Sequence, residues 1–255
     1  MVEVAGKSML ELTTAQAREL IRGEESTNVE IKIQRNGEDH TLQVQRKKIK
    51  TVVASGQMLP DQIGLITIKN FDERCADETI AAIETVVEQG AKALIFDVRF
   101  NPGGFKKELV RILDYLLPEG PIFRSVSNTG EESVTTSDEA CLEMPMVVLV
   151  NESSYSAAEL FAAALSEYDW AVVVGEATTG KSYYQNTFRL SDGSAVGLSV
   201  GKYTTPKENI TLAETGGLTP DVIVALEQEI KSQIYAGKLP PEEDPQIQAA
   251  VDQLK

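Results

Sequence analysis

Residues 147–185 constrain the fold more than any other stretch of this sequence. An apolar run at 147–150 leads into a polar turn, and an alanine-rich segment begins at Ser156. A second apolar run at 171–174 ends at a glycine-containing turn that is followed by Lys181. Short apolar runs are typical of buried strands, and alanine-rich segments favour helix. The stretch therefore predicts strand, helix and strand, with a serine at the start of the helix and a lysine after the second strand.

Strand and helix alternate along much of the remaining sequence, which predicts a layered α/β core. Upstream we expect a strand at 63–69, a helix at 77–89, a buried strand at 93–96 and a helix at 106–117. Downstream we expect a hairpin with strands at 187–190 and 195–200, and helices near 227–235 and 244–254. The predicted fold class is α/β, with residues 63–225 as the core and 226–255 as C-terminal helices.

The N-terminal part of the sequence has the pattern of a separate small unit. Thr13 and Gln16 have the spacing of a capping box, which predicts a helix that starts there. Asn36-Gly37 joins two alternating runs and predicts a hairpin. A unit of this size has a thin core. We assign residues 1–50 to a small domain and the polar, irregular residues 51–62 to a linker.

Charge and hydropathy argue against several classes of function. The net charge of -15 argues against binding to nucleic acid or to an anionic membrane, because both require a basic face. No apolar run approaches the roughly 18 residues of a membrane-spanning helix. Residues 1–7 lack the basic and apolar regions of a signal peptide. Cys75 and Cys141 fit no metal-binding spacing, so they are either two free thiols or one disulfide.

Nucleotide binding is one kind of chemistry that the central stretch could support. Residues 175–182 read Gly-Glu-Ala-Thr-Thr-Gly-Lys-Ser and match the P-loop pattern after an apolar strand. A P-loop must also open a helix, because the amides at the helix N-terminus help to bind the phosphates. Aromatic and β-branched residues follow Lys181 and predict a strand instead. A P-loop nucleotide-binding protein is therefore a minority alternative.

Serine hydrolysis is the other chemistry to consider. The only histidine, His40, lies in the hairpin predicted for the N-terminal unit, far from Ser156 in the sequence. The chain therefore offers no histidine that could act as the base of a Ser-His pair. Ser156 could instead be a nucleophile whose oxyanion meets free amides at a helix N-terminus. Lys181 could be its base if an apolar pocket offsets the cost of a neutral amine, about 4 to 5 kcal/mol at pH 7. Gln185, on the same face of an extended strand, could orient that amine.

A structural alternative explains the same residues. Ser153, Ser154 and Ser156 could be alternative helix caps, and Lys181 could be a surface lysine after a turn. The residues taken alone favour this alternative, since caps are far more common than nucleophiles.

Five segments, in order, resemble the C-terminal processing peptidases, also called tail-specific proteases. These are Ser-Lys serine endopeptidases with a PDZ domain attached to a crotonase-like and ClpP-like core. Residues 63–66 with Asn70-Phe71 resemble "IGYI…F", 97–104 resemble "DLRxNPGG", 154–159 resemble "SASASE", 174–181 resemble "VGExTxGK", and 217–221 resemble "GxxPD". The joint occurrence of these motifs reverses the preference for a simple cap.

The resemblance assigns roles to individual residues. It implies that Ser156 is the nucleophile, that Lys181 is the general base and that Gln185 orients the lysine. It also implies that the amide of Ala157, together with one from the turn at Gly103 and Gly104, forms the oxyanion hole. Asp97 and Arg99 would pair to support that turn. The resemblance implies no metal and no cofactor.

The resemblance also implies partners and a location. The expected substrates are proteins or peptides with unstructured C-termini, which the enzyme cleaves near those ends by an acyl-enzyme route, and no nucleic acid is involved. The resemblance does not decide whether the chain assembles into a homo-oligomer. Residues 1–50 resemble the latter half of a PDZ domain, without the loop that binds a peptide carboxylate. Members of the family usually work outside the cytoplasm, although no export signal or anchor is visible here. An inactive protease-like peptide-binding module is the alternative.

Overall fold

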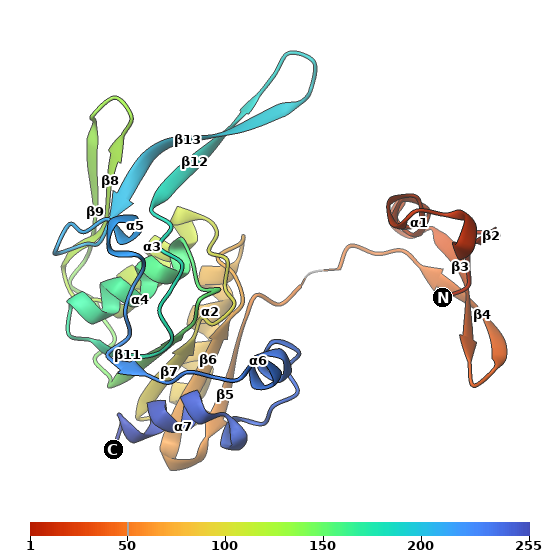
Figure 1. Cartoon of the computed structure of the whole chain (residues 1–255). Coiled ribbons are helices and arrows are strands. Elements are labelled where there is room, and N and C mark those ends of the chain that lie inside the picture. The colour runs from red at the N-terminus through yellow and green to blue at the C-terminus, as the bar shows by residue number, and fades with distance from the viewer. Residues whose placement is uncertain (50) are drawn as a thin grey trace. The chain divides into compact units, whose positions relative to one another are not determined.

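The computed structural model describes residues 1–49 and 51–255, which form two compact units, Met1–Thr51 and Val52–Lys255. The last residue of the predicted N-terminal domain, residue 50, lies outside the described residues. Each unit is considered by itself below. Figure 1 shows the elements of both units and labels most of them.

The first unit is a four-stranded antiparallel sheet with helix α1 (Figure 1). Its order is β2-β1-β3-β4, built from β1 (Glu3–Val4), β2 (Lys7–Ser8), β3 (Asn28–Arg35) and β4 (Glu38–Gln45). The predicted capping box is confirmed, since α1 (Thr14–Ile21) follows Thr13, whose hydroxyl accepts from the Gln16 amide. The predicted hairpin turn is confirmed as well, with Asn36 and Gly37 both at positive φ. Buried apolar side chains in this unit are Val4, Ala17 and Val29, so its core is thin.

A six-stranded sheet forms the centre of the second unit. Its order is β14-β11-β10-β7-β6-β5, and all neighbours are parallel except β5 and β6. The strands are β5 (Ala54–Leu59), β6 (Ile63–Ile68), β7 (Ala93–Asp97), β10 (Met146–Val150), β11 (Ala171–Gly175) and β14 (Val222–Ile223). The predicted α/β class is confirmed. Residues 54–59 were expected to be linker but form β5, because pairing with β6 satisfies their backbone groups.

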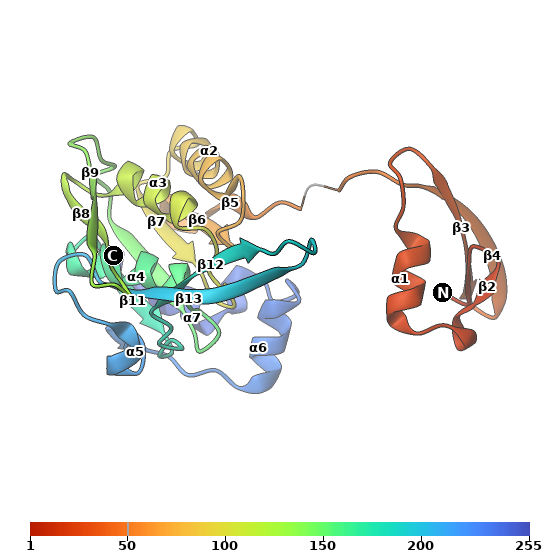
Figure 2. The ribbon, with the colours of Figure 1, turned by 90° about the horizontal axis from the view of Figure 1, so that it is seen from above.

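Helices cover both faces of this sheet (Figures 1 and 2). Helices α2 (Cys75–Glu88), α3 (Lys106–Leu116) and α4 (Ala157–Glu167) pack on one face, against alternate strand residues such as Phe96 and Val148. Helix α7 (Pro245–Asp252) packs on the other face through Ile247 and Ala250, against residues such as Ile95 and Leu149. Parallel strands buried on both faces are apolar at nearly every position, as the sequence of β10 illustrates. Helix α6 (Gln228–Tyr235) precedes α7.

A second sheet is antiparallel, with the order β12-β13-β8-β9. It contains β8 (Gly120–Ser127), β9 (Glu132–Ser137), β12 (Tyr183–Arg189) and β13 (Ala195–Thr204). The predicted hairpin around Ser191-Asp192-Gly193 is confirmed, and its strands are longer than expected. The outer part of β12 and β13 projects from the rest of the unit (Figures 1 and 2).

Short elements complete the second unit. They are the 3-10 turns at Pro60–Gln62 and Pro241–Glu243 and helix α5 (Leu212–Thr215); a further 3-10 turn, Met9–Glu11, belongs to the first unit. Within the described residues, no helix is both long enough and apolar enough to cross a membrane.

Candidate active site

The turn between β10 and α4 holds Ser156 in an unusual backbone conformation. Its φ of 61° and ψ of -121° are disfavoured for any residue with a side chain, and such a conformation costs of order 1–3 kcal/mol. It persists because other contacts fix it: the Ser156 amide donates to Oε2 of Glu159 at 2.9 Å. The turn places Ser156, half-buried, at the N-terminus of α4, where free amides and the helix dipole favour negative charge.

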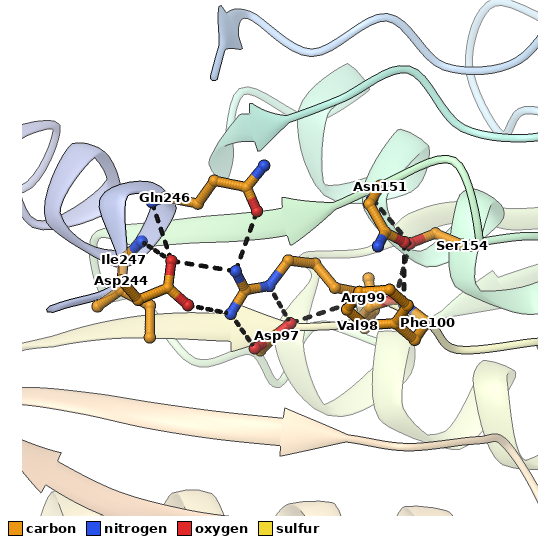
Figure 3. A network of polar contacts seen from close by, with 9 residues as sticks. All are labelled: Asp97, Val98, Arg99, Phe100, Asn151, Ser154, Asp244, Gln246 and Ile247. Carbon is orange, nitrogen blue, oxygen red and sulfur yellow. Dashed lines mark hydrogen bonds and ion pairs between the residues drawn. The ribbon is translucent and has the colours of Figure 1, made fainter. Parts of the chain in front are cut away.

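A buried polar network attaches this turn to the residues that follow β7 (Figure 3). The Ser154 hydroxyl donates to the Val98 carbonyl at 2.8 Å and accepts from the Asn151 amide at 3.0 Å. The Asn151 side chain in turn accepts from the Phe100 amide at 2.9 Å. Ser154 is fully buried, so its hydroxyl has a structural role. The alternative in which Ser154 caps the helix is therefore excluded.

The turn after β7 lies directly against Ser156. A Cβ added to Gly103 would meet Cβ of Ser156 and the Tyr155 carbonyl oxygen, each at 2.8 Å, and the Ala157 nitrogen at 2.9 Å. Such contacts are too short for any side chain. Gly103 also has a φ of +84°, which independently favours glycine. A larger residue at this position would push the two turns apart.

The free amides at this junction are those of Ala157 and Gly104. The Gly103 amide already donates to Oδ1 of Asn101 at 2.8 Å, and the Gly103 carbonyl accepts from the Phe71 amide at 2.8 Å. Neither the Ala157 nor the Gly104 amide has a hydrogen-bond acceptor among the described residues. The sequence left open which glycine would contribute an amide, and the hydrogen bonding favours Gly104.

Glu159 connects the serine turn to the segment that precedes Lys181. Its carboxylate is fully buried and accepts four hydrogen bonds. Beyond the Ser156 amide, the donors are the Thr178 hydroxyl at 2.5 Å, the Gly180 amide at 2.6 Å and the Lys181 amide at 2.9 Å. A buried carboxylate needs such donors in place of water. Glu159 therefore fixes the backbone of the predicted nucleophile relative to that of the predicted base.

The side chains of Lys181 and Gln185 are held much less firmly. Lys181 is half-buried, and its Nζ lies 5.5 Å from the centroid of the Tyr155 ring. Gln185 is exposed. Within the described residues, no hydrogen bond joins Lys181 Nζ to Ser156 or to Gln185. The structure therefore brings the three residues to one site without forming the contacts that the resemblance implies.

Tyr203 of β13 lines the same cleft as Ser156 and Lys181, and no motif in the sequence indicated it. The Tyr203 hydroxyl donates to the Lys181 carbonyl. Burial raises the pKa of the Tyr203 phenol, while the neighbouring Ser156 side chain acts in the opposite direction. The Tyr203 hydroxyl is therefore bonded to the lysine segment and lies near the Ser156 side chain.

A cleft of about 900 Å³ contains the predicted catalytic residues. Ser156, Ala157, Gly104, Lys181 and Gln185 all line it. Such a volume accommodates several residues of an extended peptide, because pockets of 300–1,000 Å³ bury most of a drug-sized ligand. In the described part of the chain, no group of three or more His, Cys, Asp or Glu is placed to hold a metal ion.

A buried ion-pair network stabilises the strand end from which the glycine turn begins (Figure 3). The predicted pairing of Asp97 with Arg99 is confirmed, with Arg99 Nη2 2.6 Å from Asp97 Oδ2. Arg99 also pairs with Asp244, the N-cap of α7, at 2.8 Å, and donates to Gln246 Oε1 at 3.0 Å. Burial alone would lower the pKa of the Arg99 guanidinium, but the two carboxylates raise it above its usual value. The network attaches the C-terminal helix to the strand end beside the site.

The two cysteines are free thiols. Cys75 is buried at the start of α2, and this burial raises the pKa of its thiol to about 12. A thiol held protonated at neutral pH is a poor nucleophile.

Comparison with known proteins identifies the family. The model of peptidase family S41 matches residues 62–224. The chain belongs to peptidase family S41. The carboxyl-terminal-processing protease of Synechocystis sp. is 36% identical over 252 residues, which cover 96% of this chain and 57% of that protein. The carboxy-terminal processing protease CtpA of Bacillus subtilis is 34% identical over 208 residues, covering 80% of this chain and 45% of that protein.

The chain thus spans about half the length of these curated S41 relatives. A solved structure titled photosystem II D1 C-terminal processing protease has a TM-score of 0.63 and 24% sequence identity, covering 96% of this chain and 68% of that one. This likeness shows the fold, a mixed α/β architecture with a parallel and an antiparallel sheet. It agrees with the motif resemblance in the sequence.

The P-loop alternative is contradicted by the structure. Gly175 ends β11, and the first element after Lys181 is strand β12, as the sequence predicted. Because no helix starts at residues 176–182, the amides that a P-loop offers to phosphate are not arranged there.

Proposed function

We propose that this S41 chain is a serine endopeptidase that cleaves proteins or peptides near their C-termini through a Ser-Lys acyl-enzyme mechanism. The observation that carries the proposal is the direct packing of Gly103 against Ser156 and the Ala157 amide. This packing brings a strained serine and two free amides together at the wall of one cleft, which is the arrangement that acyl transfer needs.

Each residue has a distinct role in the proposed mechanism. Ser156 Oγ attacks the substrate carbonyl, and Lys181 Nζ takes the proton from that hydroxyl. The amides of Ala157 and Gly104 donate to the oxyanion. Lys181 then gives the proton to the leaving amine, and water, activated in the same way, releases the acyl group from Ser156.

Two supporting roles complete the proposal. Gln185 lines the cleft with Lys181, and we assign it the orientation of the lysine amine in the substrate complex. Glu159 is a positioning residue, because within the described residues its carboxylate accepts hydrogen bonds only from backbone amides and the Thr178 hydroxyl. No step requires a metal or a cofactor.

The first unit fits a role in substrate recognition. Its sheet and helix lie within residues 1–50, which resemble the latter half of a PDZ domain, and PDZ domains add a peptide as a strand beside their helix. Protein substrates with unstructured C-termini and a location outside the cytoplasm follow from the same family resemblance.

Mass spectrometry of an unstructured protein with an apolar C-terminus tests the proposal. The wild type should cleave near that terminus, and Ser156→Ala and Lys181→Met should each reduce kcat by about four orders of magnitude or more. Both variants should keep the circular dichroism spectrum of the wild type. Full activity of Lys181→Met would remove the lysine from the mechanism.

A fluorophosphonate probe separates the enzyme from an inactive peptide-binding module. In an active site, Ser156 Oγ attacks the phosphorus of the probe and displaces fluoride, which leaves a phosphonylated serine, and Ser156→Ala is not labelled. If the wild type leaves the probe unmodified and every substrate intact, the chain is a binding module with an S41 fold.

A further inference from the structure

Lys106 lines the catalytic cleft and has no acidic partner in the described part of the chain. It is the first residue of α3, two residues after Gly104, and it shares the cleft with Ser156. Burial lowers the pKa of the Lys106 amine, and no described carboxylate acts on it in the opposite direction. The cleft therefore contains a partly desolvated cation that has no countercharge from the described residues.

Lys231 shows how a lysine with acidic partners differs from Lys106. Its Nζ lies 2.9 Å from Glu176 Oε2 and 3.1 Å from Glu152 Oε1. Burial alone would lower the pKa of Lys231, but Glu176 and Glu152 raise it. A cation without such partners is costly once water is withdrawn from it. A ligand that brings a negative charge to Lys106 would remove that cost.

Two aromatic rings connect the Lys106 amine to the nucleophile. Lys106 Nζ lies 4.1 Å from the centroid of the Phe123 ring, and the Phe123 and Tyr203 ring centroids are 5.9 Å apart. The Tyr203 hydroxyl in turn lies near the Ser156 side chain. Because one extended residue spans about 3.5 Å, the amine is within reach of substrate residues close to the scissile bond.

The wall of the cleft around these rings is apolar. Leu109 and Leu160 line the cleft together with Phe123 and Tyr203, and all four belong to one buried cluster. A substrate group that enters here must bury an apolar stem and carry its charge at the end that meets Lys106. Ligand sites commonly have this form, in which apolar walls surround a few polar groups that fix orientation.

The charge of the cleft differs in sign from that of the protein. The charged residues that line it are three lysines and two acids: Lys106, Lys107, Lys181, Asp72 and Glu131. The chain as a whole has a net charge of -15, so most of its surface repels an anionic peptide. Lys181 is the proposed base, and the Lys107 amine lies 3.7 Å from Glu108 Oε1. Lys106 is thus the cleft lysine left for an anionic ligand.

We propose that Lys106 binds a carboxylate of the substrate, so that the enzyme prefers peptides with a negative charge close to the scissile bond. The inference rests on the proposed function for its occupant. The carboxylate belongs either to a Glu or Asp side chain or to the C-terminus of the substrate. Either source forms the same charge-assisted hydrogen bond with the amine and supplies the missing countercharge.

Matched peptide pairs test the inference by kinetics. In one set of internally quenched peptides, Glu replaces Gln at one position, which is moved through about three residues on each side of the cut. A further pair differs by a free against an amidated C-terminus. The wild type should favour the carboxylate by about tenfold in kcat/KM in one pair. The position of that pair tells a side-chain carboxylate from a terminal one.

Substitutions at Lys106 show whether this amine is responsible. Lys106→Met keeps an unbranched side chain over Phe123 and removes the charge, so the tenfold ratio should fall to about one. Lys106→Arg should keep the ratio, because it keeps the charge. Lys107→Met is the matched control and should also keep it, since that amine is already paired with Glu108. A purely structural defect would slow cleavage of both peptides in a pair and leave their ratio unchanged.

Binding to Ser156→Ala separates this inference from the proposed function. Fluorescence anisotropy of the labelled peptides should show about tenfold tighter binding of the carboxylate member, and adding Lys106→Met should abolish the difference. Cleavage with a ratio near one in every pair, or a preference that survives Lys106→Met, overturns the inference and leaves the protease intact. A binding preference that depends on Lys106, without cleavage of any peptide by the wild type, supports the carboxylate site and overturns the protease. Equal binding of both members of every pair overturns the inference.

Discussion

The serine half and the lysine half of the site are held in different ways. Backbone hydrogen bonds fix the Ser156 turn, and Gly103 packs against it with no room for a side chain. On the other half, Glu159 fixes the amide of Lys181, but the lysine side chain has no hydrogen-bond partner in the described chain. Gln185 is exposed.

The difference follows from what each half must do. The oxyanion donors are most effective when they are already in place, since no reorganisation is then needed during reaction. In the proposed mechanism the lysine amine approaches the serine, accepts a proton and releases it, so it needs freedom to move. A bound peptide would exclude water around Lys181 and restrict its side chain. We therefore expect changes in the serine half to have larger effects than changes around the lysine.

Gly103→Ala should have the largest effect of the four substitutions below. The added methyl would meet Ser156 Cβ at 2.8 Å and would displace the serine turn from the glycine turn. A displacement near 1 Å lowers kcat/KM by about 100-fold. Gly130→Ala is the matched control, because Gly130 has nearly the same φ (+85°) with nothing within 4 Å. Equal activity of the two variants would show that the close packing is irrelevant.

Glu159→Gln should have the next largest effect. One carboxylate oxygen becomes an amide group that faces hydrogen-bond donors, so a buried polar contact is lost. We expect a free energy of unfolding lower by about 1–3 kcal/mol and a kcat lower by about tenfold or more. Glu167→Gln is the control on the same helix, since in the described part of the chain its carboxylate accepts only from the exposed Lys207 amide. Urea unfolding and kinetics measure the two effects, and unchanged kcat would limit Glu159 to a structural role.

Tyr203→Phe tests the contact between the two halves. The variant keeps the buried ring and removes the hydroxyl that donates to the Lys181 carbonyl and lies near the Ser156 side chain. Loss of this hydrogen bond should lower kcat by about tenfold with KM nearly unchanged. Tyr115→Phe serves as the control, because Tyr115 does not line the cleft. A rise in KM alone would instead place the Tyr203 hydroxyl in substrate binding.

Gln185→Ala should have the smallest effect. The Gln185 side chain is exposed and makes no hydrogen bond in the described chain, so its contribution is limited to the substrate complex. We expect kcat to fall about threefold. Arg189→Ala, four residues further along the strand and not among the residues that line the cleft, is the control. A loss as large as that of Gly103→Ala would contradict the comparison and would show that the lysine half is organised by substrate.

The sequence predicted most elements of the second unit because their signals are local. Short apolar runs and helical periodicity identified β6, β7, β10, β11 and the helices between them. The segment between α3 and β10 carries weaker signals, and strands β8 and β9 were not predicted. Their pairing with β13 depends on residues far along the chain. Strand β5 was missed for the same reason. Gly56 and the polar residues beside it have the local pattern of a linker, and they form a strand because they pair with β6.

By itself, the sequence determined the α/β class, the family resemblance and the positions of Ser156 and Lys181, because motifs and periodicity are properties of neighbouring residues. Only the tertiary structure decided which groups meet. It showed that the Gly103 amide is occupied, that the Gly104 amide has no acceptor among the described residues, and that the Tyr203 hydroxyl donates to the Lys181 carbonyl. It also paired Arg99 with Asp244, 145 residues away. Such contacts depend on how the layers pack, and no local pattern records that packing.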